Sequence, residues 1–132
     1  MAFSLDVVTP DRVVLSEQAV SLVAPGVLGS FGVLTNHAPF MSELKVGEMR
    51  FTTEQGKEVQ VAVSGGFIQV FENKITVLAD SAERGDEIDV DRARRARERA
   101  RADLQAASDL VTRARAEEEL SRAQNRLRIA GG

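Results

Sequence analysis

The sequence predicts an α+β fold: an N-terminal β-sandwich or flattened barrel, followed by a C-terminal antiparallel hairpin of two helices. The two halves differ in helix-breaking residues, because seven of the ten glycines and all three prolines precede residue 83. They also differ in charge: residues 1–82 hold five basic and nine acidic residues, whereas residues 83–132 hold twelve arginines and eleven acidic residues. We therefore expect a β domain over residues 1–84 and a helical domain over residues 85–132.

Composition excludes several classes of protein. The chain has 132 residues, 43% hydrophobic and 28% charged, as globular domains have. The absence of cysteine excludes a disulfide scaffold and a thiolate metal site. The chain has one histidine, His37, which excludes a multi-histidine zinc site, so we expect no bound metal. No apolar run is long enough to span a membrane and no secretory signal is visible, which makes the cytoplasm the default compartment. The net charge of −3 argues against a general nucleic-acid binder.

Alternating hydrophobic residues in the first half predict half-buried strands. Residues 3–7 alternate apolar and polar side chains with a period of two, and the valines at 59, 61 and 63 alternate with Glu58, Gln60 and Ala62. Further short runs are separated by turn residues, and they cover residues 12–15, 19–24, 30–34 and 48–53. Together with the hairpin described next, these runs predict eight to ten short strands.

Two dipeptides mark changes of direction in this half. Glu72-Asn73 lies between the apolar runs 67–71 and 74–78, which is the layout of a tight hairpin. Gly65-Gly66 follows an apolar run and predicts a bend or bulge between two strands.

Residues 89–107 contain no glycine or proline, and their apolar residues recur at steps of three and four, which predicts a helix. Ser108-Asp109 interrupts the pattern and can cap a second helix, which continues to Gly131. The apolar stripe of both helices is mostly alanine, and each buried methyl contributes only about 0.8 kcal/mol. We therefore expect a hairpin of marginal stability that can move.

Common catalytic motifs are missing. The sequence has no phosphate-binding P-loop and no dinucleotide-binding glycine motif, and Ala62 breaks the nucleophile-elbow pattern around Ser64. His37 lies in the loop 35–39 with no acid or nucleophile partner nearby in sequence. We expect no catalytic residue and no enzyme activity of the chain's own.

Arginines gather on one face of each predicted helix. Arg92, Arg95 and Arg99 share a face of the first helix, and Arg122 and Arg126 share a face of the second. If the helices fold back on each other, these guanidinium groups converge, and such groups bind phosphate oxygens with bidentate geometry. Spacing alone favours the simpler interpretation, a solvated face in which the arginines pair with the glutamates at 98 and 117–119.

Three segments carry a resemblance to a known family. Residues 31–39 (Phe-Gly-Val-Leu-Thr-Asn-His-Ala-Pro), residues 61–67 (Val-Ala-Val-Ser-Gly-Gly-Phe) and residues 7–11 (Val-Val-Thr-Pro-Asp) are similar to segments of the ε subunit of F-type ATP synthases. One departure is Thr35-Asn36, where the family more often has a Pro-Gly-like pair. The resemblance covers essentially the whole chain.

This resemblance implies a non-catalytic, peripheral subunit on the cytoplasmic side of the cell membrane. Its β domain would dock on the γ subunit and the membrane c-ring of a complex that translocates protons or sodium ions. Its helices, when extended, would reach the α and β subunits of the catalytic head and inhibit ATP hydrolysis.

Some bacterial members of the family bind ATP through an I/L-D-x-x-R-A motif, and residues 88–93 (Ile-Asp-Val-Asp-Arg-Ala) match it in full. The resemblance thus implies ATP as a regulatory ligand, with no required cofactor, that favours the docked, non-inhibitory hairpin. Glu83 and Asp89 would accept from the adenine amino group or a ribose hydroxyl, and the four arginines would balance the negative charge of ATP. Arg92 would be needed most on the nucleoside side, and Arg122 and Arg126 on the phosphate side. Ile88 and Ala93 would offer apolar surface beside the base. The expected ATP-binding residues are Glu83, Ile88, Asp89, Arg92, Ala93, Arg99, Arg122 and Arg126.

Two interpretations from other classes remain open on the residues. One is a nucleic-acid-binding β domain with an arginine-rich helical tail, although acidic residues interleave with the arginines of the first helix and the chain has no Tyr or Trp for base stacking. The other is a small enzyme that acts through Ser64 or His37.

Overall fold

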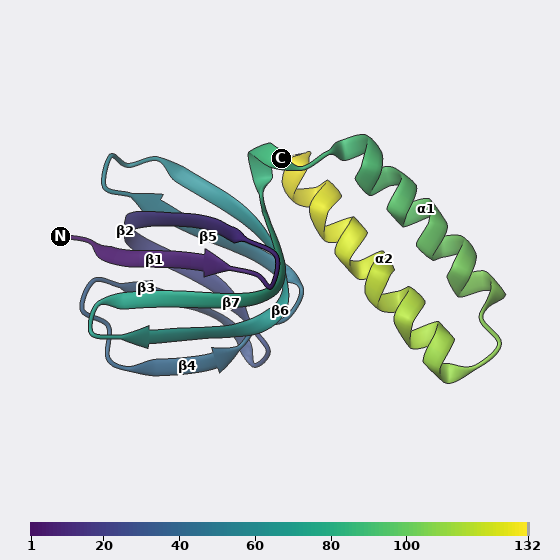
Figure 1. Ribbon diagram of the computed structural model, residues 1–132, viewed down its shortest axis with the longest axis horizontal. Coiled ribbons are helices and arrows are strands. Elements are labelled where there is room, and N and C mark those ends of the chain that lie inside the picture. The colour runs from purple at the N-terminus through teal and green to yellow at the C-terminus, as the bar shows by residue number, and fades with distance from the viewer. Residues whose placement is uncertain (132) are drawn as a thin grey trace.

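The computed structural model describes residues 1–131, which form a seven-stranded sheet followed by two helices. The predicted α+β fold class is confirmed. In Figure 1 the hairpin of α1 and α2 projects from one end of the β-sandwich. The elements are β1 (Phe3–Val8), β2 (Val13–Gly26), β3 (Gly29–Leu34), β4 (Phe40–Glu43), β5 (Gly47–Thr53), β6 (Glu58–Phe71), β7 (Lys74–Arg84), the 3-10 turn η1 (Gly85–Glu87), α1 (Val90–Ala106) and α2 (Leu110–Ala130).

The sheet closes on itself. Neighbouring strands follow the order β1-β7-β6-β5-β2, and β1 pairs with β2 as well, so these five strands form a ring. β1 runs parallel to β7, and every other pairing is antiparallel. β3 and β4 extend the ring at β2 and β6. The result is a flattened barrel whose two broad faces enclose one core.

The structure has seven strands, so the expected eight to ten was wrong. β2 and β6 are each 14 residues long, and β2 unites the runs 12–15 and 19–24 that the sequence suggested as separate strands. Gly65 and Gly66 lie inside β6, and not between two strands, with φ values of 70° and 103°. Pairing with β7 keeps the same register on both sides of them, so they bend one continuous strand.

The predicted alternation of residues 3–7 is confirmed by burial. Phe3, Leu5 and Val7 are 1%, 0% and 0% exposed, and they pack in the core with Phe51 and Ile68. The predicted hairpin at Glu72-Asn73 is also confirmed, since Phe71 pairs with Lys74 and both turn residues have positive φ.

Both helices begin at an aspartate. The Asp89 carboxylate accepts a hydrogen bond from the Arg92 N–H at 3.1 Å, and the Asp109 carboxylate accepts one from the Thr112 N–H at 2.8 Å. The hydrogen bonds from the backbone and side chain of Thr112 lower the pKa of Asp109. Capping of the second helix at 108–109 is thus confirmed, with Asp109 as the cap.

The hairpin has a thin interface. Ala93 and Ala100 of α1 and Ala116 and Ala123 of α2 are its most buried residues, at 1–2% exposure. Short side chains let the helices approach closely but remove little apolar area from water. None of the helices that the structure describes is long and apolar enough to cross a membrane.

The hairpin rests on the β-sandwich through α2, which contacts β5, β6 and η1. Asn125 is 2% exposed and donates from Nδ2 to the Gly47 carbonyl oxygen at 2.9 Å. Ile129, at 4% exposure, lies against Gly85. One buried hydrogen bond and one apolar side chain therefore carry much of this docking contact.

Candidate functional site

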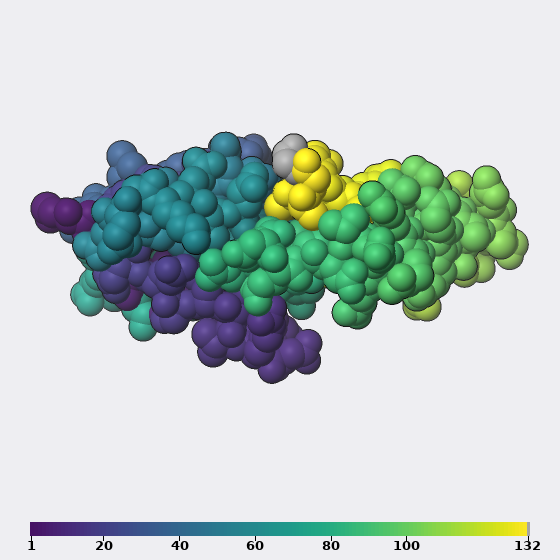
Figure 2. Space-filling view, turned by 90° about the horizontal axis from the view of Figure 1, so that it is seen from above, coloured from purple at the N-terminus to yellow at the C-terminus, as the bar shows by residue number. Residues whose placement is uncertain are grey.

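A cavity of about 510 Å³ lies where the hairpin meets the β-sandwich. Figure 2 shows that the N-terminal part of the chain, in purple, projects beside the helical region, in green. The volume is within the range of small-molecule sites. The cavity is lined by Thr9, Asp11 and Arg12 of the β1–β2 turn, by Asp80, Ser81, Ala82 and Glu83 of β7, by Asp89, Arg92, Ala93, Arg95, Ala96 and Arg99 at or in α1, and by Arg126 of α2.

Three arginines of α1 line the cavity without a carboxylate partner. No ion pair within the described residues involves Arg92, Arg95 or Arg99. The expected salt-bridged face does exist, but it uses other arginines of α1: Glu98 pairs with Arg97 and Arg101, both at 3.1 Å. The charge of the cavity arginines is thus left available for an anion.

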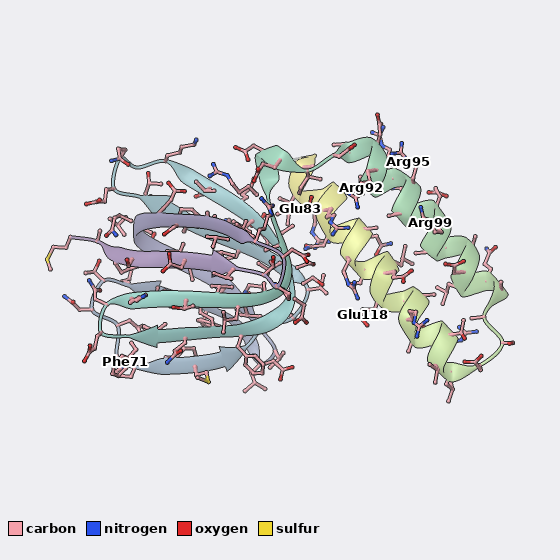
Figure 3. All side chains as sticks on the ribbon, in the orientation of Figure 1. Phe71, Glu83, Arg92, Arg95, Arg99 and Glu118 are labelled. Atoms are coloured by element: carbon pink, nitrogen blue, oxygen red, sulfur yellow. The ribbon has the colours of Figure 1, made fainter. Side chains whose placement is uncertain are left out.

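Arg126 is the cavity arginine that has a partner. Its Nε lies 2.5 Å from Glu83 Oε1, and this ion pair joins α2 to the end of β7. Both side chains are about one-third exposed, at 32% and 30%. Figure 3 shows Glu83 at the end of the β-sandwich nearest the hairpin, with Arg92, Arg95 and Arg99 spaced along α1. A phosphate that binds Arg126 must compete with, or share, the Glu83 carboxylate.

Asp89 lies at the N-terminal end of α1, on the cavity wall. Its Oδ1 accepts the hydrogen bond from the Arg92 N–H that caps the helix. Its second oxygen takes part in none of the hydrogen bonds found among the described residues, so it can accept from an amino or hydroxyl group of a ligand. Ala93 and Ala96 add small apolar surface one and two turns further on.

Two of the eight expected residues do not line the cavity. Ile88 is half-buried in the link between η1 and α1. Arg122 lines a much smaller adjoining pocket, which shares Glu83 and Arg126 with the main cavity. The Arg122 Nη2 lies 2.5 Å from Glu118 Oε1, and its Nε is buried without a hydrogen-bond partner. The remaining six line the cavity: Glu83, Asp89, Arg92, Ala93, Arg99 and Arg126.

The cavity also contains residues that the sequence did not single out for it. Arg95 is one of them: the sequence spacing places it on the face of Arg92 and Arg99, and it lines the cavity with them. Arg12 and its neighbours come from the β1–β2 turn, far away in the chain. No local sequence signal links that turn to α1, because their proximity depends on the pairing of β1 with β7.

The residues of the alternative enzyme hypothesis do not line the main cavity, although Ser64 lines the small adjoining pocket. Ser64 is 9% exposed inside β6, opposite Ser81 of β7. His37 Nδ1 lies 2.7 Å from the Ala38 carbonyl oxygen, and the ring packs edge-on against Phe40. Among the described residues, no three His, Cys, Asp or Glu side chains are grouped so that they could hold a metal ion.

Comparison with known families gives two adjoining matches. Residues 2–85 match the family described as the ATP synthase delta/epsilon chain, beta-sandwich domain. Residues 86–131 match the family described as the ATP synthase delta/epsilon chain, long alpha-helix domain. The two matches together span nearly all of the chain.

Curated relatives agree with these matches. The chain is 50% identical over 127 residues to an ATP synthase epsilon chain of Nitratidesulfovibrio vulgaris, which covers 96% of this chain and 94% of the relative. It is 48% identical over 132 residues to an ATP synthase epsilon chain of Anaeromyxobacter sp., which covers 99% of each.

Two solved structures are similar in fold. A chain of the Euglena gracilis mitochondrial ATP synthase, in a structure of OSCP, F1 and the c-ring, matches with a TM-score of 0.80 and 27% identity over 94% of this chain and 78% of that one. A chain of the Tetrahymena thermophila mitochondrial ATP synthase central stalk and c-ring matches with a TM-score of 0.63 at 14% identity, over 96% and 95%. The second likeness bears on the fold alone.

Proposed function

The chain belongs to the family of ATP synthase delta and epsilon chains, and from this we propose that it serves as the non-catalytic ε-type subunit of the central stalk of an F-type ATP synthase. That complex translocates protons or sodium ions. The chain couples the rotor to the catalytic head and regulates chemistry that other subunits carry out. It sits peripherally at the cell membrane, on the cytoplasmic side.

The β domain docks on the γ subunit and the c-ring. Support comes from an exposed apolar face on β4, β6 and β7: Met41, Phe67, Phe71 and Leu78 are 53–63% exposed. Phe67 pairs directly with Leu78 across β6 and β7, so these side chains adjoin. Exposed apolar patches of this kind mark protein interfaces.

The helical hairpin binds ATP in the cavity beside the β domain. The observation that carries this proposal is that arginines from both helices line the same cavity as Asp89 and Glu83. Asp89 and Glu83 accept from the adenine amino group or a ribose hydroxyl, and Ala93 flanks the base from the cavity wall. Ile88, which precedes Asp89 outside the cavity, turns toward the base when ATP binds. The four arginines at 92, 99, 122 and 126 balance the negative charge of ATP. Arg92 acts on the nucleoside side, whereas Arg122 and Arg126 bind the phosphates. Arg122 reaches the phosphates from the adjoining pocket after it leaves Glu118.

ATP binding regulates the hairpin. A ligand that bridges both helices stabilises the docked form by its differential affinity for that form. Without ATP, the thinly packed helices leave the β domain, extend to the α and β subunits of the catalytic head and inhibit hydrolysis. Abundant ATP therefore relieves inhibition.

Calorimetric titration of the purified chain with ATP, ADP, GTP and adenosine tests the site. We expect heat with ATP, and we expect the double change Arg122→Ala and Arg126→Ala to weaken ATP more than adenosine, because a charge-assisted hydrogen bond contributes about 1.5–3 kcal/mol. Arg113→Ala, a change of an arginine on α2 that lines neither pocket, is the matched control. If titration of ATP into the unaltered chain gives no heat of binding, the proposed nucleotide site is wrong.

Rotor docking has a separate test. Phe67→Glu places a charge in the exposed apolar face and should reduce retention of the chain by the assembled complex during purification. Val13→Glu, at a residue that is 62% exposed on β2, controls for the added charge. Equal retention of both variants would argue against this face as the docking surface.

A further inference from the structure

The β domain contributes one basic residue to the cavity wall, Arg12, which comes from the turn between β1 and β2. The other charged residues that the β domain contributes to the wall are acidic: Asp11, Asp80 and Glu83. Arg12 is therefore the residue that allows this side of the cavity to attract a phosphate group.

The backbone that carries Arg12 is fixed by short-range hydrogen bonds. The Thr9 N–H donates to the Arg12 carbonyl oxygen at 2.9 Å, and the Arg12 N–H donates to Thr9 Oγ1 at 3.3 Å. Pro10 lies between them and restricts the turn further. The root of the Arg12 side chain is thus held in place, which lowers the entropy cost of a contact with a ligand.

The Arg12 guanidinium forms no ion pair within the described residues. In this respect it resembles Arg92 and Arg99 across the cavity, and it differs from Arg126, which pairs with Glu83. An arginine that lines a cavity and lacks an internal partner keeps its donors for a ligand.

We infer that Arg12 binds the phosphate end of the nucleotide from the β domain, so that the ligand ties the hairpin to the β-sandwich as well as α1 to α2. This inference rests on the proposed function of the cavity as an ATP site. It assigns the docking effect of ATP to a specific contact. Arginines of α1 and α2 alone would favour any closed hairpin, docked or undocked, because they all move together with it. Glu83 of β7 also stays with the β domain, but it is assigned to the nucleoside end of the ligand and is paired with Arg126. Arg12 stays with the β domain, so its bond to the ligand exists only when the hairpin is docked.

The same contact explains how the ligand can hold α1. α1 packs on α2, and α2 packs on the sheet, while the cavity separates α1 from the β1–β2 turn. A ligand between Arg12 and the arginines of α1 bridges that space directly. Population of the docked form then rises in proportion to the affinity that Arg12 adds.

The test compares the full chain with its Arg12→Gln, Arg12→Lys and Arg113→Gln variants by calorimetry with ATP and with adenosine. We expect Arg12→Gln to weaken ATP binding about 10- to 100-fold, the range for loss of a charge-assisted hydrogen bond, and to leave adenosine binding unchanged. Arg12→Lys keeps the charge and should bind ATP more tightly than Arg12→Gln. Arg113→Gln removes the same charge from α2 away from the cavity and should bind ATP as the unaltered chain does.

A second measurement follows the Arg12 side chain of the unaltered protein by NMR. The side-chain Nε–H resonance of Arg12 in the unaltered chain should shift when ATP is added and stay in place when adenosine is added; its assignment comes from its absence in Arg12→Lys. The inference is overturned if Arg12→Gln binds ATP like the unaltered chain, or if the Arg12 Nε–H resonance does not shift when ATP is added. In either case the ATP site itself still stands. If the unaltered chain binds no ATP, the proposed site and this inference both fail. Equal losses of ATP and adenosine in Arg12→Gln would contradict a phosphate contact.

Discussion

The β-sandwich and the helical hairpin are stabilised in different ways. The β-sandwich encloses large apolar side chains, such as Phe3, Phe51 and Leu22, each at 1% exposure. The most buried residues between the helices are four alanines. Full burial of a large side chain contributes about 1.5–3 kcal/mol, whereas a methyl group contributes about 0.8 kcal/mol. We therefore expect the β-sandwich to act as a permanent scaffold, and the position of the hairpin to depend on additional contacts.

The junction between them is also unlike the scaffold core. It contains the hydrogen bond from Asn125 to the Gly47 carbonyl and the ion pair between Arg126 and Glu83. Polar groups of this kind exchange protein partners for water at a small net cost when they separate. We therefore expect the hairpin to be able to leave the β domain without disturbing the core of the sheet.

The largest expected effect lies in the scaffold. Phe51→Ala should lower the free energy of unfolding by about 3–5 kcal/mol, because it removes a buried ring and leaves a cavity. Urea unfolding followed by a probe in the β domain measures this loss. Ala100→Gly, in the buried stripe of α1, should cost about 2 kcal/mol and act on the hairpin, because it lowers helix propensity by about 1 kcal/mol and removes a buried methyl that contributes about 0.8 kcal/mol. A greater loss of β-domain stability from Ala100→Gly than from Phe51→Ala would contradict the difference in stability between the β-sandwich and the hairpin.

A smaller effect is expected at the junction. Asn125→Ala removes the buried hydrogen bond to Gly47 and should weaken docking by about 0.5–1.5 kcal/mol. Amide hydrogen exchange measures it, with faster exchange expected in α2 and unchanged exchange in β1 and β7. Gln124→Ala changes the exposed neighbouring residue and serves as the control. Unchanged exchange in α2 of Asn125→Ala would show that this contact does not hold the hairpin.

The smallest effect concerns pH and the start of α2. Because hydrogen bonds from Thr112 lower the pKa of Asp109 in the folded chain, the cap is fully effective above the unfolded pKa of this group and is lost as pH falls through the folded pKa. The first turn of α2 should therefore loosen only in acid, below about pH 4. The Thr112 amide resonance reports this loss in a pH titration. Asp109→Asn keeps a good cap without a titrating group and should abolish the acid-induced shift; persistence of that shift would assign it to another group.

Local features of the fold could be predicted from the sequence. The alternation in residues 3–7, the turn at Glu72-Asn73 and the cap at Asp109 each depend on residues that are neighbours in the chain. The number of strands was not predictable in this way. β6 continues through Gly65 and Gly66 because β7 pairs with it on both sides of the bend, and that pairing is a long-range property.

The candidate site also contains residues that local spacing predicts and residues whose position depends on long-range packing. Arg92 and Arg99 could be placed on one face of a helix from spacing alone, and they line the cavity together. The position of Arg122 depends on how α2 is rotated against the sheet, and in the structure this residue pairs with Glu118 beside the cavity. Arg12 had no signal at all, because only the closed sheet brings its turn opposite α1.

If ATP holds a weakly docked hairpin on a stable β-sandwich, the distance between the hairpin tip and the β domain must respond to ATP. The chain contains no cysteine, so Ser108→Cys at the tip of the hairpin and Gln55→Cys in the β5–β6 turn accept two spin labels without competition. The distance distribution between the labels is then recorded with and without saturating ATP. We expect a broad distribution without ATP that narrows with ATP to the single distance of the docked structure. The same distribution in both conditions, in a chain shown to bind ATP, would contradict the claim.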